Sequence, residues 1–151
     1  MRLGMLFVAA AMLGACSQPI PARIEVQDAS AGASAPGQRQ AAAYLTLRND
    51  GGRDERLRSV RIEGIAAATV HESSMTDGVM RMRPVEMLDL PAGATVAMAP
   101  GGLHVMLTGL TKPLGKGDKL RATLLFEKSP PLKAVIPVIS SAKLEASHSN
   151  H

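Results

Sequence analysis

The chain has few aromatic residues and little net charge. Aromatics make up 2% of its 151 residues, with no Trp, one Tyr and two Phe, so no platform exists on which nucleic-acid bases could stack. The net charge of +4 is small, and the Lys and Arg residues are scattered, without the clustered stripe that phosphate binding needs. We interpret the basic residues as an ordinary solvated surface and expect no nucleic-acid partner.

The signatures of nucleophilic catalysis are also missing. The sequence has no Gly-x-Ser-x-Gly segment and no histidine in a nucleophile context. Its only cysteine, Cys16, lies near the N-terminus, so no thiol remains in the rest of the chain to act as a nucleophile. The sequence therefore predicts a protein that is not an enzyme.

The N-terminal residues have the pattern of a secretory signal peptide over 1–15. Arg2 supplies a positive charge, an apolar stretch follows, and small residues end the segment. Residues 13–16, LGAC, resemble the lipobox of bacterial lipoproteins, which implies lipidation of Cys16 and a periplasmic protein anchored to a membrane. An ordinary signal peptide with a stray cysteine is the alternative. By resemblance to sorting in enteric bacteria, Ser17 permits outer-membrane transport, and anchoring in either membrane stays open.

Short alternating segments separated by turn residues occupy most of the remaining chain. Residues 43–48 and 120–126, for example, alternate apolar with polar side chains, and no window has the period of an amphipathic helix. This pattern predicts an all-β fold over residues 41–139, an antiparallel sandwich or barrel. Pro137 interrupts the last strand, 134–139, and so predicts that this strand lies at an edge.

The segments on either side of this domain read as irregular. Residues 16–40 are rich in Ala, Ser, Pro and Gly, and we expect a flexible tether there in preference to a short edge strand at Ile24 and Val26. Residues 140–151 form a polar tail without periodicity, which predicts disorder.

Two histidines and two methionines stand out by type and spacing. His71 is followed after ten residues by Met82, then after twenty-one by His104, and Met106 stands two positions further on. Thioether sulfur is a poor ligand for zinc, magnesium or calcium but a good one for Cu(I), and imidazole suits copper in either oxidation state. These four residues therefore predict a Cu(I) site.

The local pattern agrees with two of these ligands acting together. His104 and Met106 alternate with Leu103, Val105 and Leu107, as in a half-buried strand. His104 and Met106 then share one face, about 7 Å apart. That separation suits two ligands of one ion and leaves at least one further ligand to come from elsewhere.

The spacing resembles the signature of the periplasmic PCuAC copper chaperones, His-x10-Met-x21-His-x-Met. Neighbouring segments resemble that family too, namely DGVMRMRP at 77–84, LPAG at 90–93, PGGLHVML at 100–107 and GD at 117–118. The resemblance covers roughly residues 42–126. It implies a cupredoxin-like Greek key that binds Cu(I) through His71, Met82, His104 and Met106. It also implies delivery of copper to a Sco-type thioredoxin-like protein or to the copper site of cytochrome c oxidase during oxidase assembly.

Other potential ligands receive less weight. The family often places a methionine close behind the first histidine, whereas here the nearest is Met75, which we keep as a possible auxiliary ligand. His148 and His151 in the tail are also possible auxiliary ligands, for Cu(II), although an inert terminus is favoured. Because methionine packs well into irregular gaps, the remaining methionines of the domain are predicted to be core residues. These are Met80, Met87 and Met98.

A carrier of copper fits this ligand set better than an electron-transfer protein. Blue-copper electron transfer needs a Cys thiolate in the fold, and Cys16 lies outside the expected domain. Methionine cannot be oxidised to a disulfide, so the site can stay open in an oxidising compartment. The competing hypothesis is a lipid-anchored β-sandwich that binds a protein partner without metal.

Overall fold

The computed structural model describes residues 20–140 and 142–144. The predicted signal peptide over 1–15 and its Cys16 lie outside these residues, as do His148 and His151. The described part of the chain forms β1 (Ile24–Gly32), β2 (Gln40–Asn49), β3 (Glu55–Ile62), β4 (Ile65–Thr76), β5 (Val79–Pro84), β6 (Leu88–Leu90), β7 (Thr95–Ala97), β8 (Leu103–Leu110), β9 (Lys119–Phe126) and β10 (Leu132–Ile139).

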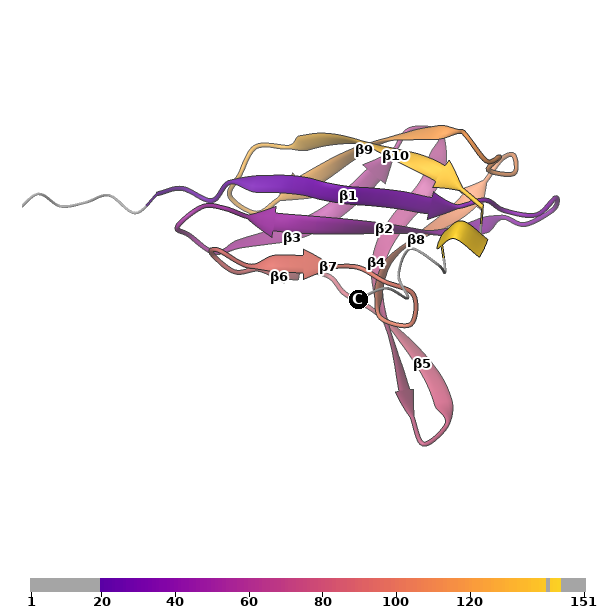
Figure 1. Ribbon diagram of the computed structural model, residues 1–151, viewed down its shortest axis with the longest axis horizontal. Helices are drawn as coiled ribbons and strands as arrows, with labels where there is room; N and C mark the ends of the chain where they lie inside the picture. The colour runs from indigo at the N-terminus through magenta and orange to yellow at the C-terminus, as the bar shows by residue number, and fades with distance from the viewer. Residues whose placement is uncertain (1–19, 141, 145–151) are drawn as a thin grey trace, which may run out of the picture.

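The strands form two packed layers (Figure 1). One layer has the order β5-β4-β8-β2-β1, with β7 also paired to β2, and the other has the order β10-β9-β3-β6. The layers join where β1 runs parallel to the end of β10, and the other pairings are antiparallel. Neighbouring strands such as β2 and β8 are distant in sequence, as in a Greek key. The predicted all-β antiparallel sandwich is confirmed.

The core is aliphatic, as the shortage of aromatic residues requires. Leu47, Leu107 and Leu124 are fully buried between the layers, and Phe126 lies at the margin of the core with 8% of its surface exposed. In strands such as β2 and β9, alternate residues point inward. The opposite faces are thereby free to carry other side chains.

Residues 24–32 form the strand β1, so the flexible tether predicted for 16–40 is wrong over this stretch. β1 pairs with β2 from Ile24, opposite Asn49, to Ala31, opposite Ala43. Its small residues read as a linker in the sequence, and one of them, Gly32, packs closely against a neighbouring side chain. A Cβ atom on Gly32 would lie only 3.3 Å from Leu144 Cδ2.

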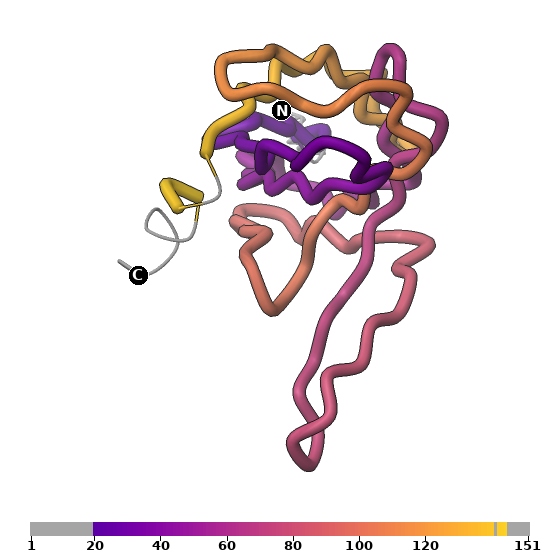
Figure 2. Tube along the Cα trace, turned by 90° about the vertical axis from the view of Figure 1, so that its right-hand side faces the viewer, coloured from indigo at the N-terminus to yellow at the C-terminus, as the bar shows by residue number. Residues whose placement is uncertain are grey.

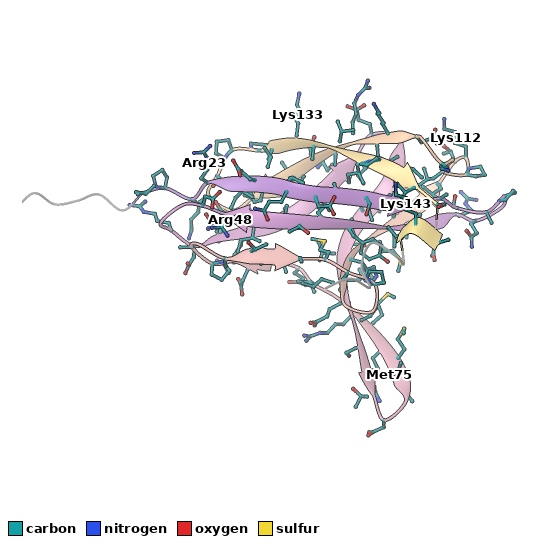
Figure 3. All side chains as sticks on the ribbon, viewed as in Figure 1. Arg23, Arg48, Met75, Lys112, Lys133 and Lys143 are labelled. Atoms are coloured by element: carbon teal, nitrogen blue, oxygen red, sulfur yellow. The ribbon has the colours of Figure 1, made fainter. Side chains whose placement is uncertain are left out.

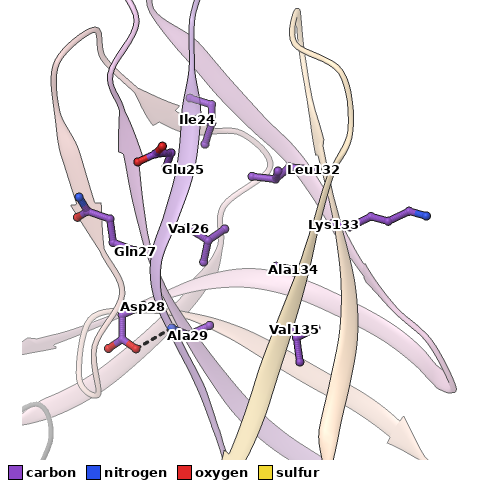
Figure 4. A pocket seen from close by; sticks show the side chains of 10 residues that line it. All are labelled: Ile24, Glu25, Val26, Gln27, Asp28, Ala29, Leu132, Lys133, Ala134 and Val135. Atoms are coloured by element: carbon purple, nitrogen blue, oxygen red, sulfur yellow. Dashed lines mark hydrogen bonds between the residues drawn. The ribbon is translucent and has the colours of Figure 1, made fainter.

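β10 lies between β9 and β1 in the strand order, so the prediction of an edge strand is wrong for Val138 and Ile139, where β10 pairs with β1. Pro137 pairs with Lys119 of β9, whereas β1 joins β10 only from Val138 onward. The proline, which has no N–H group, therefore stands just before the second ladder begins. Ahead of that point β1 and β10 diverge and leave a groove of about 590 Å³, lined by residues 24–29 and 132–135 (Figure 4).

Residues 142–144 form one helical turn, so the disorder predicted for 140–151 is wrong for these three residues. Leu144 is 8% exposed, and its N–H donates to the carbonyl of Ser140 at 2.9 Å. Within the described ranges, helical structure is nowhere both long and apolar enough to cross a membrane.

β4 and β5 form a hairpin that extends away from the two layers (Figures 1 and 2). Its turn is Asp77-Gly78, and both residues have positive φ, 52° and 75°, as a two-residue turn with the twist of a hairpin requires. Among the described strands, β5 is an edge strand paired with β4 alone, and its residues are all exposed. The hairpin thus presents both faces to solvent along much of its length.

Candidate metal centre

Three of the four predicted ligands lie on neighbouring strands β4 and β8 and share one face. His71 of β4 is directly opposite His104 of β8, and Thr69 is directly opposite Met106. Paired residues of neighbouring strands point to the same side of a sheet, as do alternate residues of one strand. His71, His104 and Met106 therefore gather on one surface, as predicted for the last two.

That surface is turned away from the core. Val70 of β4 and Val105 and Leu107 of β8 alternate with the ligand positions and are buried between the layers. The candidate site consequently lies on the outer face of the layer and not inside the sandwich.

Met82 reaches the same face from the hairpin. It is paired with Ser73 of β4, two positions beyond His71, and so points to the same side of the sheet as His71. Ser73 is itself held against the β7–β8 loop, because its N–H donates to the carbonyl of Gly102 at 3.0 Å. The hairpin therefore places Met82 on the face that carries the other three, although the pocket that Met82 shares with His104 and Met106 is not lined by His71.

Met82, His104 and Met106 line one pocket of about 390 Å³. The other lining residues come from β2 with the segment before it, from β4 and from the β7–β8 loop. They are Gln38, Gln40, Ala41, Ala42, Tyr44, Ser73, Pro100 and Gly101. None of these lining residues is Asp, Glu, Lys or Arg. The thioethers of Met82 and Met106 and the imidazole of His104 favour a soft cation over the hard divalent ions that prefer carboxylates.

His104 is oriented through one ring nitrogen. The side chain is 6% exposed, and Nδ1 lies 3.0 Å from the carbonyl oxygen of Gly102. A carbonyl only accepts, so Nδ1 carries the proton and donates it. The lone pair is then on Nε2, the arrangement by which metal-binding histidines are usually fixed.

His71 has a ring nitrogen without a hydrogen bond. Nε2 lies 3.2 Å from Thr69 Oγ1, whereas Nδ1 is buried and has no partner among the described residues. Buried polar atoms are nearly always paired. The two imidazole rings are 5.9 Å apart between centroids. A metal ion bound between the two imidazoles would supply the partner that Nδ1 of His71 lacks.

Tyr44 places a third ring near the site, 6.5 Å from that of His104. Burial raises the pKa of Tyr44 above its ordinary value, because the phenolate is poorly solvated there. The phenol is therefore neutral at physiological pH and supplies no anionic oxygen ligand.

Carboxylates do not contribute to this surface. Glu72 points to the opposite side of β4, where its Oε2 accepts a hydrogen bond from Arg83 Nε at 2.8 Å. Across residues 20–140 and 142–144, no three His, Cys, Asp or Glu side chains gather closely enough to hold a metal ion. The donors assembled at the candidate site are imidazole and thioether.

The other methionines divide between core and surface. Met98 is 1% exposed, which confirms its predicted place in the core. The same prediction is wrong for Met80 and Met87, which are 60% and 38% exposed. Met75 lies further along the hairpin, opposite Met80, and its role as an auxiliary ligand stays a prediction.

Two contacts that orient the histidines did not emerge from the sequence. Thr69 and the carbonyl of Gly102 each contact the imidazole two positions further along the chain. The available signal was the alternation itself, since residue i−2 on a strand shares the face of residue i.

The match with known proteins identifies the family. The family described as "Putative lipoprotein LpqE-like" matches residues 24–138. The chain belongs to the LpqE-like lipoprotein family. A Leifsonia xyli subsp. xyli protein named as a putative lipoprotein is 30% identical over 142 residues, which cover 87% of this chain and 86% of that protein. Membership of an LpqE-like lipoprotein family agrees with the predicted lipobox, while lipidation of Cys16 stays a prediction.

Solved PCuAC domains share the fold of this LpqE-like chain. The copper-bound PCuAC domain from PmoF2 is 26% identical with a TM-score of 0.66, covering 78% of this chain and 92% of that one. The apo PCuAC domain from PmoF1 is 26% identical with a TM-score of 0.65, at coverages of 78% and 93%. The CuI form of DR1885 from Deinococcus radiodurans is 29% identical with a TM-score of 0.60, covering 84% of each chain. The predicted relation to PCuAC domains and the cupredoxin-like fold are confirmed.

Proposed function

We propose that this protein is a periplasmic Cu(I) chaperone that binds one cuprous ion through His71, Met82, His104 and Met106. The observation that carries the proposal is the buried, unpaired Nδ1 atom of His71, on the face where the other three side chains gather. Two of the similar solved structures, from PmoF2 and DR1885, hold copper. The relation between these proteins supports the same cargo here.

The hydrogen bonds around the histidines suggest which atoms bind. For Nδ1 of His71 to bind the ion, Nε2 must carry the ring proton, and Thr69 Oγ1 lies 3.2 Å away, where it can accept that proton in a hydrogen bond. The Gly102 carbonyl leaves the lone pair of His104 on Nε2. Two imidazoles and two thioethers are all neutral, so the ion keeps its positive charge. Transfer to an acceptor with thiolate ligands is then favourable, because the soft anionic sulfur neutralises that charge.

The proposed role is delivery and not catalysis or electron transfer. The resemblance to PCuAC chaperones points to a Sco-type thioredoxin-like protein or the copper site of cytochrome c oxidase as acceptor. Cys16, through its lipid, would hold the carrier at the periplasmic surface of a membrane, where such acceptors are reached.

An anaerobic Cu(I) competition titration tests the proposal. Because Cys16 is the only cysteine, a Cys16→Ser background removes the one thiol that would compete for the ion. We expect one tightly bound Cu(I), lost in His104→Ala and in Met82→Leu and retained in Met87→Leu, a control that removes an exposed thioether elsewhere. Absence of tight binding in the parent chain would overturn the copper assignment and favour the metal-free, partner-binding β-sandwich.

A further inference from the structure

Three methionines stand in solvent on the β4–β5 hairpin. Met75 is 65% exposed, Met80 60% and Met82 48%. Methionine normally fills gaps in a core, as Met98 does here at 1% exposure. β5 has no strand neighbour besides β4 in the described structure, so packing against a core does not explain sulfur at these positions.

The hairpin register arranges these methionines as a ladder. Met75 and Met80 are directly opposite each other, and the next pair on the same face is Ser73 with Met82. Opposed residues have Cβ atoms about 4.5–5.5 Å apart, which places the Met75 and Met80 thioethers within reach of one ion. Met82 follows Met80 at about 7 Å along β5. Figure 3 shows Met75 near the free end of the hairpin.

The two faces of the hairpin differ in chemistry. The face opposite the methionines carries Arg81 and Arg83, and Arg83 is paired with Glu72. The methionine face has only Ser73 between Met75 and His71 on β4, and so carries no charged side chain along this path. An unbroken series of soft, neutral donors therefore leads from the end of the hairpin to the imidazoles.

Resting on the Cu(I)-binding function proposed above, we infer that Met75 and Met80 form a second, all-thioether Cu(I) site. Through it the ion enters and leaves the main site by way of Met82. Each transfer is a ligand exchange in which a dative bond from Met75 or Met80 breaks as one from Met82 forms. Copper stays Cu(I), and a thioether carries no proton, so neither electrons nor protons need another source. The pair has fewer protein ligands and more solvent than the main site, so it binds more weakly and exchanges faster.

Methyl NMR on the full chain with methionine labelled at its ¹³C-methyl group tests the second site. The probe is Cu(I) supplied anaerobically as its acetonitrile complex in the Cys16→Ser background. The first equivalent should shift the Met82 and Met106 signals, and further Cu(I) should shift Met75 and Met80, with the Met87 and Met98 signals unmoved. If Met75 and Met80 respond no more than Met87, the second site is overturned, whereas the main site is judged separately by the first equivalent.

Two variants separate the two sites and test the path between them. In His104→Ala the first, tightly bound equivalent of Cu(I) should be lost, while the Met75 and Met80 signals still shift. In Met75→Leu/Met80→Leu the tightly bound equivalent should remain, while binding of further Cu(I) is lost. Removal of Cu(I) from the main site by a bathocuproine chelator should be slower by about tenfold in the double variant, since its outer thioethers are missing. An unchanged removal rate would overturn the path.

Discussion

His71 and His104 face each other across β4 and β8, with their ring planes inclined by 48° and their centroids 5.9 Å apart. One nitrogen of each ring is in contact with the residue two positions earlier in the chain. For His71 this residue is Thr69 of β4, and for His104 it is Gly102, just before β8. The paired strands therefore set the separation of the rings, and each contact occupies one ring nitrogen and leaves the other available to bind.

Replacing Met106 by Leu separates a ligand from a packing residue. Leu has nearly the same volume, so the loss in unfolding free energy should stay below about 1.5 kcal/mol. Without the sulfur, Cu(I) affinity should fall by about tenfold or more, equivalent to about 1.4 kcal/mol of binding free energy. Thermal unfolding and Cu(I) competition on the same sample check both numbers. A variant that unfolds readily yet keeps its affinity would assign Met106 to packing.

Thr69 should influence copper binding without contacting the ion. In Thr69→Val the hydroxyl beside His71 Nε2 is lost, so the tautomer with its proton on Nε2 and its lone pair on Nδ1 loses a hydrogen-bond acceptor. Partners of metal-binding histidines typically contribute about 10–100-fold in affinity. We expect a loss in this range by Cu(I) competition, with ¹⁵N NMR of the His71 ring reporting the tautomer. Thr69→Ser, which keeps the hydroxyl, is the matched control, and equal affinities in the two variants would contradict this role.

Glu55 makes stability depend on pH at a point distant from the site. It is 1% exposed and accepts hydrogen bonds from the backbone N–H groups of Arg56, Lys128 and Ser129 at 2.8, 3.1 and 2.7 Å. Burial by itself would raise the pKa of Glu55, but the Ser129 hydroxyl and these N–H groups outweigh burial and hold it below its ordinary value. The carboxylate therefore stabilises the fold above the pKa of the unfolded state, and this contribution disappears as pH falls through the folded-state pKa.

Glu55→Gln removes that charge while keeping the side-chain shape. Hydrogen bonds to charged groups contribute about 1.5–3 kcal/mol each, and we expect a loss in that range near neutral pH by urea unfolding. The difference from the parent should shrink in acid, where the parent carboxylate is protonated too. Glu63→Gln is the control, since the Glu63–Arg121 pair is exposed and such pairs contribute about 0–1 kcal/mol. If the loss of unfolding free energy in Glu55→Gln did not change with pH, the stabilising role of the ionised carboxylate would be contradicted.

Asn49 should be a larger determinant of stability than its size suggests. It is fully buried, and its Nδ2 donates to the carbonyls of Arg53 and Leu90 at 2.8 and 2.9 Å. Its Oδ1 accepts from the N–H groups of Arg23 and Gly51 at 3.2 and 3.0 Å. Asn49→Ala leaves these backbone groups without partners, so unfolding free energy should fall by about 2–4 kcal/mol. Chemical denaturation measures the loss, and a change below about 1 kcal/mol would show that water replaces the amide.

The elements that the sequence predicts well are those whose two faces differ. In β8, Val105 and Leu107 enter the core while His104 and Met106 face the site, so the alternation is plain in the sequence. β1 lacks such contrast, because its buried end is Ser30, Ala31 and Gly32, and its strand character comes from pairing with β2 and β10.

The candidate ligands could be predicted, but their surroundings could not. Met80 and Met98 are alike as residues, and only the projection of the hairpin from the layers exposes one while the other is buried. The unpaired Nδ1 of His71 likewise depends on the position of Thr69 Oγ1 and on burial by neighbouring strands. Both are products of tertiary structure, which residue spacing does not encode.

The short Asp77-Gly78 turn also explains why the interval between His71 and Met82 is fixed. With two residues in the turn, Met82 pairs with Ser73 and points to the same face as His71. Inserting or deleting one residue in the hairpin would turn every β5 side chain to the other face, presenting Arg81 and Arg83 to the imidazoles. The site consequently tolerates most substitutions in the hairpin better than changes in its length. An insertion or deletion would turn Met82 away from the imidazoles even though the residue is still methionine.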